Sequence, residues 1–430
     1  MYWYSEAIIY HIFAFSQCGA PFQNDYSETT PRLSELELWI PHIQSMGCNA
    51  VLFSPVFKSR THGYDTTDYF TIDNRIGDNE SFRVLVEKFH ASGIRVILDG
   101  VFNHSGRDFF AFRNLQNGDR SYADWFSGVN FDHGNHLGDS FSYDTWSGHL
   151  ELVKFNLKNE SAKNYLLDAA KFWIEYFNID GLRLDSANVT DFDFMCQLHR
   201  ITTNLKPDFW LMGEVVSGEY SRWVNPETLH SVTNYILYKG LFSSHNDFNL
   251  FELAYTLQHQ SEFGNKLCTF LDNHDQPRIA SNAARPEFLN TLYLLLYTLP
   301  GVPTIYYGSE WAITGTKQDN SDAPLRPRLD PINPSGDMEL AEYIKKLAKI
   351  RCTQNALKFG DYRQIYLEYQ KPFIFERRND NNRITVAINI SDKEETITLD
   401  GNFYDLLNEK NLCGSEITLA PHSGIIALAI

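Results

Sequence analysis

The sequence lacks any long apolar run. No stretch of its 430 residues approaches the roughly 18 apolar residues that a membrane-spanning helix needs. Residues 1–6 contain no basic segment ahead of the apolar residues 8–13, so this start does not resemble a secretory signal peptide and instead favours a first strand. We therefore expect no membrane partner and a cytoplasmic location.

Cysteine pairs and an excess of positive charge are also missing. The six cysteines are scattered, with no CxxC pair and no metal-ligand spacing, so we expect buried free thiols in a reducing compartment. The 54 acidic and 37 basic side chains give a formal net charge of −17. This charge argues against nucleic acid or an anionic membrane as a partner and suits a neutral substrate.

What the sequence does contain is a long alternation of strands and helices. The nearly all-apolar strand that begins at Arg95 is typical of a parallel sheet buried on both faces. The helix before it is expected to be capped by Asn79 and ended by Gly93, with Phe82, Leu85, Val86 and Phe89 on its apolar face. Eight βα units in series predict an α/β protein with a (β/α)8 TIM barrel. Strands are expected at 8–13, 50–55, from 95, at 181–187, 209–215, 231–237, 268–272 and 303–307, and helices at 34–46, 79–92, 166–177, 191–206, 249–263, 286–299 and 338–350.

Two segments depart from this alternation. Residues 105–158 are rich in Gly, Asp, Asn and aromatic residues and are too long for an ordinary connection, which indicates a subdomain inserted after the third strand. From residue 358 onward, short alternating strands separated by turn signals predict a C-terminal antiparallel β-sandwich. The expected domains are therefore the barrel (1–104 and 159–357), the inserted subdomain (105–158) and the sandwich (358–430).

The segment 181–188 carries the first candidate catalytic group. Arg183 and Asp185 are two residues apart in a predicted strand, so their side chains point to the same side. An arginine beside a carboxylate favours its ionised form, which at the C-terminal end of a barrel strand makes Asp185 a candidate nucleophile. A purely structural ion pair is the alternative interpretation of these two residues.

Other predicted strands also end in polar residues. A single acidic residue at such a position is usually a helix N-cap, but four strand ends with carboxylates, histidines and an arginine favour an active site. A retaining glycosidase needs two carboxylates about 5–5.5 Å apart, and adjacent strands lie about 4.8 Å apart, so Asp185 and Glu214 fit the pair. The polar residues at the strand ends are Asp99, Asn103 and His104, then Arg183 and Asp185, then Glu214, and finally Asp272, Asn273, His274 and Asp275.

Four of these segments resemble the sequence regions of the α-amylase superfamily, family 13 of the glycoside hydrolases. They are DGVFNH at 99–104, GLRLDSAN at 181–188, GEV at 213–215 and FLDNHD at 270–275. The resemblance covers essentially the whole chain. It implies Asp185 as the nucleophile, Glu214 as the general acid/base and Asp275 as a third carboxylate that binds sugar hydroxyls. It also implies substrate-binding roles for Tyr64 (the sugar-stacking ring, in a loop at 62–69 similar to the family's), Asp65, His104, Arg183, His274 and Arg278.

Within the family, the segment 146–156 resembles a region of cyclomaltodextrinases, neopullulanases and maltogenic amylases, although Val153 stands where that group has proline. Calcium-dependent amylases carry a histidine just after the nucleophile strand, whereas this chain has Asn188 followed by Val189 and Thr190. We therefore predict no cofactor, and that calcium site is not expected.

The expected function is a retaining hydrolase of α-1,4-linked glucose in short maltooligosaccharides or cyclodextrins. We expect no separate starch-binding module, because residues 358–430 are only long enough for the sandwich. In the insertion, Trp125, Phe126 and Trp146 are expected either to wall the cleft or to pack the subdomain core. A 4-α-glucanotransferase and an α-1,6-glucosidase would use the same residues. A non-catalytic sugar-binding relative is a fourth possibility, but it predicts the loss of a carboxylate and all three are present. The sequence leaves linkage preference, endo or exo action and oligomeric state open.

Overall fold

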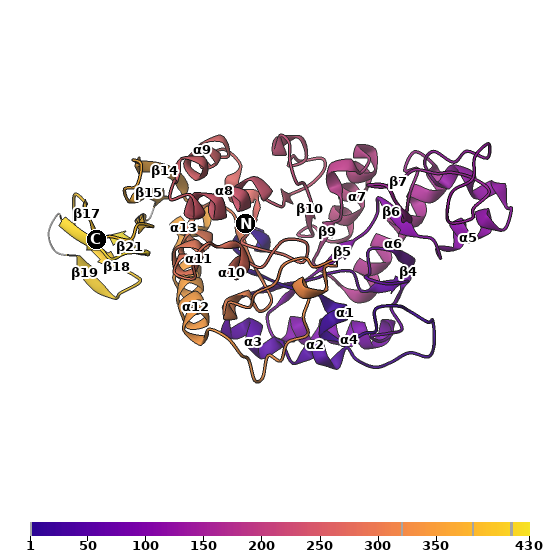
Figure 1. The fold of residues 1–430 in the computed structure, drawn as a ribbon, viewed down its shortest axis with the longest axis horizontal. Helices are drawn as coiled ribbons and strands as arrows, with labels where there is room; N and C mark the ends of the chain where they lie inside the picture. The colour runs from indigo at the N-terminus through magenta and orange to yellow at the C-terminus, as the bar shows by residue number, and fades with distance from the viewer. Residues whose placement is uncertain (1, 320, 381, 413–415) are drawn as a thin grey trace. The chain divides into compact units, whose positions relative to one another are not determined.

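The structure is a computed structural model that describes residues 2–319, 321–380, 382–412 and 416–430 (Figure 1). The chain forms two compact units. One comprises Met1–His11, Pro41–Ala50 and Thr233–Ile430, and the other comprises Ile12–Ile40 and Val51–Val232. None of the described helices has the length and apolar composition that crossing a membrane requires.

Eight strands form one sheet in the order β11-β10-β9-β5-β2-β1-β13-β12. The pairs β5–β9, β9–β10, β10–β11, β12–β13 and β1–β13 are parallel. Directly after β11, Thr233 forms a parallel bridge with Cys268 of β12, so both ends of this order meet. The predicted barrel is therefore confirmed. Its strands are β1 (Ile9–Ile12), β2 (Ala50–Phe53), β5 (Arg95–Gly100), β9 (Gly181–Leu184), β10 (Trp210–Gly213), β11 (Ser231–Val232), β12 (Cys268–Phe270) and β13 (Val302–Tyr306).

In the unit that contains β9, three long helices follow strands: α4 (Asn79–Ala91), α6 (Glu160–Phe177) and α7 (Phe192–Leu205). The four predicted apolar residues of α4 are buried, as expected. The predicted cap is wrong, because Asp78 accepts the backbone N–H of Ser81 while the Asn79 side chain accepts that of Ile72. On α6, Trp173 and Phe177 are buried, whereas Tyr176 is exposed.

Two further sequence predictions fail at identifiable residues. The helix expected at 34–46 is split into α2 (Ser34–Glu37) and α3 (Ile40–Ser45), because Pro41 has no N–H to continue the first helix. The strand expected at 231–237 stops at Val232, because the Asn234 side chain accepts the N–H of Leu237 and starts a helix, α8 (Tyr235–Asn246). Helix α9 (Phe251–His259) is shorter than expected.

The inserted segment has its own small sheet, in the order β6-β8-β7 (His104–Gly106, His149–Lys154 and Thr145–Trp146), and one helix, α5 (Phe110–Gln116); Figure 1 shows these elements together. Two of its predicted aromatic residues differ in burial. Phe126 is buried against Phe112 and Phe155, whereas Trp146 is exposed. The hairpin of β3 (Phe57–Ser59) and β4 (Thr66–Ile72) precedes it.

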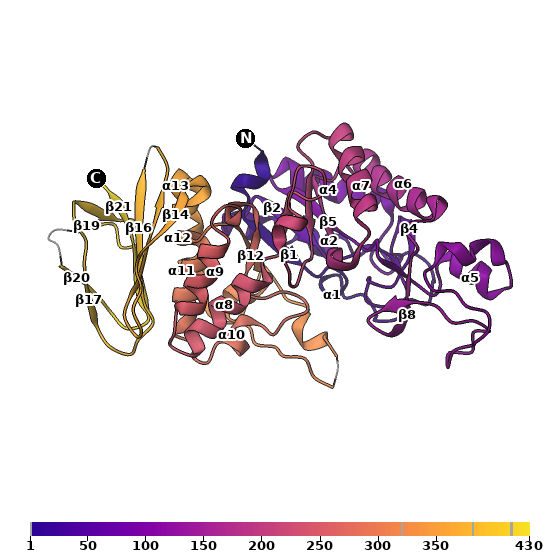
Figure 2. The same ribbon diagram turned by 90° about the horizontal axis from the view of Figure 1, so that it is seen from above.

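The C-terminal strands form the predicted antiparallel sandwich. One sheet has the order β14-β15-β16-β21-β18-β19, and β17 pairs with β20 across an apolar core. Helices α11 (Phe288–Thr298) and α12 (Met338–Thr353) lie beside it (Figure 2). The strands are β14 (Asp361–Tyr366), β15 (Phe373–Arg378), β16 (Arg383–Asn389), β17 (Glu395–Thr398), β18 (Phe403–Asp405), β19 (Lys410–Leu412), β20 (Glu416–Leu419) and β21 (Ser423–Ala429), and the remaining helices are α1 (Ala14–Gln17), α10 (Ile279–Asn282) and α13 (Asn355–Phe359).

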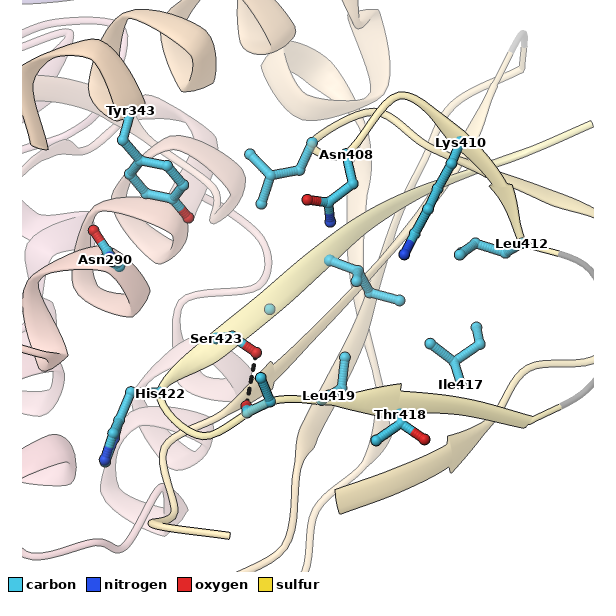
Figure 3. A pocket seen from close by; sticks show the side chains of 14 residues that line it. Asn290, Tyr343, Asn408, Lys410, Leu412, Ile417, Thr418, Leu419, His422 and Ser423 are labelled. Carbon is cyan, nitrogen blue, oxygen red and sulfur yellow. Dashed lines mark hydrogen bonds between the residues drawn. The ribbon is translucent and has the colours of Figure 1, made fainter. Parts of the chain in front are cut away.

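A pocket of about 300 Å³ lies where α11 and α12 meet the sandwich (Figure 3). Tyr343 of α12 and Asn290 of α11 line it from the helices, and Lys410 and His422 line it from the sandwich. It contains none of the residues that the sequence predicts to act on substrate.

Candidate active site

Asp185 and Glu214 follow the last residues of two adjacent parallel strands. Gly213 of β10 is in register with Leu184 of β9, and the N–H of Glu214 donates to the carbonyl of Leu184 over 2.8 Å. Both residues therefore lie at the C-terminal ends of neighbouring strands, where barrel enzymes place their catalytic groups.

The guanidinium of Arg183 joins three carboxylates. Its Nη1 lies 2.6 Å from Oδ2 of Asp99 and 3.4 Å from Oδ1 of Asp185, and its Nη2 lies 2.9 Å from Oε1 of Glu214. Burial opposes the charge, but the nearby Asp99, Glu214 and Asp185 hold the pKa of Arg183 well above its usual range. A permanent positive charge thus lies beside the three carboxylates. We call Arg183, Asp99, Asp185 and Glu214 the Arg183 cluster.

The three carboxylates of the Arg183 cluster differ in exposure. The Asp99 side chain is fully buried, has the shortest contact with Arg183 and accepts the hydroxyl of Tyr64 over 2.8 Å. The side chains of Asp185 and Glu214 are 10% and 12% exposed. Asp99 is therefore the structural partner of the arginine, and Asp185 and Glu214 are the two that a ligand can reach.

Ser186 connects these two carboxylates, and sequence reasoning did not single it out for a role. Its N–H donates to Oε2 of Glu214 and its hydroxyl to Oδ2 of Asp185, both over 3.0 Å. Its φ of +50° lies in the left-handed region that non-glycine residues seldom adopt. Such conformations concentrate at functional sites, but they leave no mark in a single sequence.

Tyr64 contacts this cluster through Asp99, and His104 contacts Tyr64. His104 is buried, with Nε2 lying 3.1 Å from the carbonyl of Tyr64 and Nδ1 the same distance from the amide of Asn103. Burial lowers the pKa of His104 to about 3, so the ring is neutral near pH 7. The exposed ring of Trp146 lies 6.0 Å from that of His104.

Asp65 has a local structural role. Its carboxylate accepts the N–H and the hydroxyl of Thr61, over 3.1 and 2.7 Å, and its side chain is almost fully buried. These contacts fix the loop that carries Tyr64.

In the other unit, His274 and Asp275 form a second group with Arg326. Nε2 of His274 lies 2.9 Å from Oδ2 of Asp275. Arg326 donates through Nη2 to Oδ1 of Asp275 over 3.0 Å and through Nε to the carbonyl of His274 over 3.1 Å. Arg326 was missed because it lies 51 residues after Asp275 in a segment without a recognisable pattern.

The structure does not support the substrate-binding role predicted for Arg278. It is fully buried, and its guanidinium donates to the carbonyls of Tyr307 and Leu325 and to the hydroxyl of Ser309. It also lies 4.0 Å from the centre of the Tyr306 ring. A buried guanidinium with these partners stabilises the loops after β13, and its burial keeps it from a ligand.

Within the described ranges, no group of three or more His, Cys, Asp or Glu side chains is arranged to hold a metal ion. Cys18, Cys48 and Cys268 are buried, as expected, whereas Cys196 is partly buried and Cys352 is exposed. Cys48, Cys196 and Cys352 are free thiols. Cys413, also predicted to be one, lies outside the described residues.

Comparison with known proteins identifies the family. The Alpha amylase, catalytic domain family matches residues 36–356. The chain therefore belongs to the α-amylase family of glycoside hydrolases, as the four sequence regions predicted.

Two curated relatives and one solved structure show similarity over nearly all of the chain. A cyclomaltodextrinase from Thermoanaerobacter pseudethanolicus is 30% identical, covering 99% of this chain and 78% of that protein. The neopullulanase 2 of Thermoactinomyces vulgaris gives the same identity and coverage. The structure of a cyclic α-maltosyl-(1→6)-maltose hydrolase from Arthrobacter globiformis superimposes with a TM-score of 0.86, at 25% identity and with all of both chains covered.

Proposed function

We propose that this enzyme is a retaining hydrolase of α-1,4-glucosidic bonds in short maltooligosaccharides and cyclodextrins. The observation that carries the proposal is the contact of one buried guanidinium, Arg183, with both Asp185 and Glu214. A retaining mechanism needs two carboxyl groups about 5–5.5 Å apart. Two carboxyl groups that contact the same guanidinium can lie at about this separation. The names of the two curated relatives support an α-glucan as substrate.

In the proposed first step, a carboxylate oxygen of Asp185 attacks the anomeric carbon as the glycosidic C–O bond breaks. Glu214 gives its proton to the departing oxygen. Water then attacks the same carbon, Glu214 takes up its proton, and Asp185 is released as the carboxylate. Each displacement inverts the anomeric carbon, so the α configuration is retained overall.

The remaining site residues are assigned by exposure. Asp275, whose side chain is 33% exposed, is proposed to bind sugar hydroxyls while Arg326 and His274 hold it in place. Tyr64 is proposed to stack on the sugar, with its hydroxyl fixed by Asp99. We assign His104 to positioning, because its side chain is almost fully buried.

One observation favours a second candidate, an enzyme that acts on α-1,6-linked cyclic maltosides. The Arthrobacter globiformis hydrolase of cyclic α-maltosyl-(1→6)-maltose is matched over its whole length, whereas the cyclomaltodextrinase is matched over 78%. For either candidate we propose a cytoplasmic location, because free thiols such as Cys48 and Cys196 are favoured in reducing compartments. We propose no cofactor.

The test is a product analysis on maltotriose, pullulan, a cyclodextrin, cyclic α-maltosyl-(1→6)-maltose and soluble starch, with the anomers followed by proton NMR. The proposal predicts α-anomeric products from maltotriose and the cyclodextrin. Initial β-anomeric products would refute the two-step mechanism, and longer products from maltotriose would indicate a glucanotransferase. Cleavage of pullulan at its α-1,6 bonds alone would indicate an α-1,6-glucosidase, and hydrolysis of cyclic α-maltosyl-(1→6)-maltose in preference to the cyclodextrin would favour the second candidate. A kcat/KM for starch about tenfold or more above that for maltotriose would contradict the preference for short substrates.

A further inference from the structure

A polar pocket of about 520 Å³ lies apart from the Arg183 cluster and shares no lining residue with it. Its volume falls within the range of about 300–1,000 Å³ that is typical of small-ligand sites. We call it the Tyr26 pocket. It is lined by Gln23, Asn24, Asp25 and Tyr26, by Arg60, and by Arg107, Asp108, Arg113 and Gln116 of α5 and the residues before it.

One wall of the Tyr26 pocket is a loop held in an uncommon conformation. Asn24 is buried, and its amide donates to the carbonyl of Ser59 and the side chain of Asn74. Its side-chain oxygen accepts the N–H of Tyr26 over 2.7 Å, and Tyr26 has a φ of +56°. A bulky residue keeps such a φ only where its surroundings impose it, and such residues cluster at ligand clamps. The result here is an aromatic ring that stays 39% exposed at the pocket.

A second wall, formed by α5 and the residues before it, is also held by hydrogen bonds before any ligand binds. Arg107 makes two hydrogen bonds to the carboxylate of Asp139, over 2.6 and 2.9 Å, and Gln116 donates to the same carboxylate over 2.8 Å. The hydroxyl of Tyr26 donates to Asp108 over 2.8 Å and so joins the two walls. A preformed pocket avoids the cost of ordering its side chains on binding.

The lining of the Tyr26 pocket offers both hydrogen-bond donors and hydrogen-bond acceptors, two arginines and two aspartates. The side chains of Arg60 and Arg113 are 47% and 62% exposed, and they lie 3.5 and 3.6 Å from Glu151 and Asp108. These distances exceed the roughly 2.7–2.9 Å of a charge-assisted hydrogen bond, so both arginines keep donors for a ligand. Asp25 and Asp108 offer acceptors on the same lining.

This mixture of donors and acceptors fits a neutral polyhydroxyl ligand better than an anion. Each sugar hydroxyl both donates and accepts, so a ring of hydroxyls can satisfy arginine and carboxylate together. A phosphate would meet two carboxylates of its own charge, which disfavours its binding. The exposed ring of Tyr26 adds a flat apolar surface on which the face of a sugar can lie.

We propose that the Tyr26 pocket is a second, non-catalytic binding site for an α-glucan chain. Tyr26 stacks on one glucose ring, while Arg60, Arg113, Asp25 and Asp108 bind its hydroxyl groups. The identity of the glucan rests on the proposed function. The site would hold a longer maltooligosaccharide near the enzyme while another chain is cleaved, so its effect should grow with substrate length.

The experiment counts bound maltoheptaose by isothermal titration on the inactive Asp185→Asn variant. We expect two molecules per chain. Adding Tyr26→Ala should leave one molecule, because the stacking ring is lost. Adding Tyr255→Ala instead, which removes a tyrosine that is 63% exposed on α9, should leave two.

Two further variants separate binding from folding. Tyr26→Gly removes the ring and relieves the positive φ, so it should lose the second site without a melting temperature below that of Tyr26→Ala. Tyr26→Phe keeps the ring and should keep the second site with a weaker affinity. Two sites in both Tyr26→Ala and Tyr26→Gly would overturn the proposal, as would displacement of maltoheptaose from the second site by inorganic phosphate.

Failure of this inference is distinguishable from failure of the proposed function. If the enzyme hydrolyses maltotriose but Asp185→Asn binds a single maltoheptaose that Tyr26→Ala leaves in place, only the second site is refuted. If maltoheptaose binds and Tyr26→Ala removes one molecule, while α-1,4 bonds are not cleaved, only the assigned reaction is refuted.

Discussion

The two ends of strand β9 both carry an aspartate, and the surroundings of these two residues differ. Asp180, just before the strand, is fully buried and is bound by His90, Arg95 and Lys206 at 2.7–2.8 Å and by the N–H of Val96 at 2.9 Å. Asp185, just after it, lies 3.4 Å from Arg183 and 3.0 Å from the hydroxyl of Ser186 and is partly exposed.

This difference separates a structural carboxylate from one that is available for chemistry. Burial alone would raise the pKa of Asp180, but the hydrogen bonds from His90 and Lys206 more than offset it and hold that pKa well below its usual range. With four partners, its two oxygens have little capacity left for a ligand. In barrel enzymes the N-terminal ends of the strands contribute stability and the C-terminal ends carry function, and a strand of four residues shows both here.

The largest expected effect is that of Asp185→Asn. Without a nucleophile the glycosyl-enzyme cannot form, so we expect kcat on maltotriose to fall by more than about 10⁴-fold. Because asparagine keeps the size and shape of the side chain, the free energy of unfolding in urea should change by less than about 1 kcal/mol. Asp193→Asn, which changes an exposed aspartate, is the matched control and should keep full activity. Retention of more than a few per cent of kcat by Asp185→Asn would end the assignment.

Glu214→Gln should depend on the leaving group. On maltotriose we expect a loss of about 10²- to 10⁴-fold, because the departing oxygen receives no proton. An aryl maltoside with a good leaving group needs no acid, so it should give a burst of the aryl alcohol followed by slow turnover, and azide should accelerate the second step. Equal losses on both substrates, without a burst, would show that Glu214 is not the acid/base.

Asp180→Asn should have the opposite profile from Asp185→Asn. It leaves Arg95, Lys206 and His90 without their carboxylate partner, so the free energy of unfolding at pH 7 should fall by about 3–5 kcal/mol. The kcat of the protein that remains folded should stay within about twofold of the wild type, since nothing at the C-terminal end of β9 changes. If kcat of the folded Asp180→Asn protein falls well beyond about twofold, the distinction between the two ends of the strand is wrong.

The same residue predicts a pH dependence of stability. The pKa of Asp180 is lower in the folded state than the value of about 3.9 expected when unfolded, so its contribution is fully present above about pH 5. As the pH falls below the unfolded value toward the folded one, that contribution is lost. The difference in unfolding free energy between wild type and Asp180→Asn should therefore shrink from pH 5 downward. A difference that stays constant over this range would mean that Asp180 does not titrate as assigned.

The smallest effect is expected at Arg326, which is a positioning residue for Asp275. Arg326→Met removes the charge-assisted hydrogen bonds to Asp275 and Asp322 and the bond to the carbonyl of His274, so kcat should fall by about tenfold with a smaller change in KM. Arg326→Lys should recover part of this loss. Combined with Asp275→Asn, Arg326→Met should add little, because both changes remove the same interaction. Full additivity would show that Arg326 acts independently of Asp275.

Much of the fold followed from local patterns. A strand has a period of two, and parallel strands end at the same edge, so the alternation of apolar runs was enough to predict the barrel and to put Asp185 and Glu214 on adjacent strand ends. Errors occurred where one side chain decides an element boundary. Asp78 rather than Asn79 caps α4, Pro41 splits a predicted helix, and Asn234 starts α8 where a strand was expected.

The sequence by itself therefore determined the family, the barrel and the strand ends that carry the candidate catalytic groups, because periodicity and short motifs are local properties. Only the tertiary structure decided the partners of those groups. Arg183 makes its shortest contact with Asp99, 84 residues away, Arg326 reaches Asp275 across 51 residues, and Arg278 turns inward to backbone carbonyls. Each of these contacts depends on how strands and loops far apart in the chain pack against one another, and spacing along the sequence does not encode that.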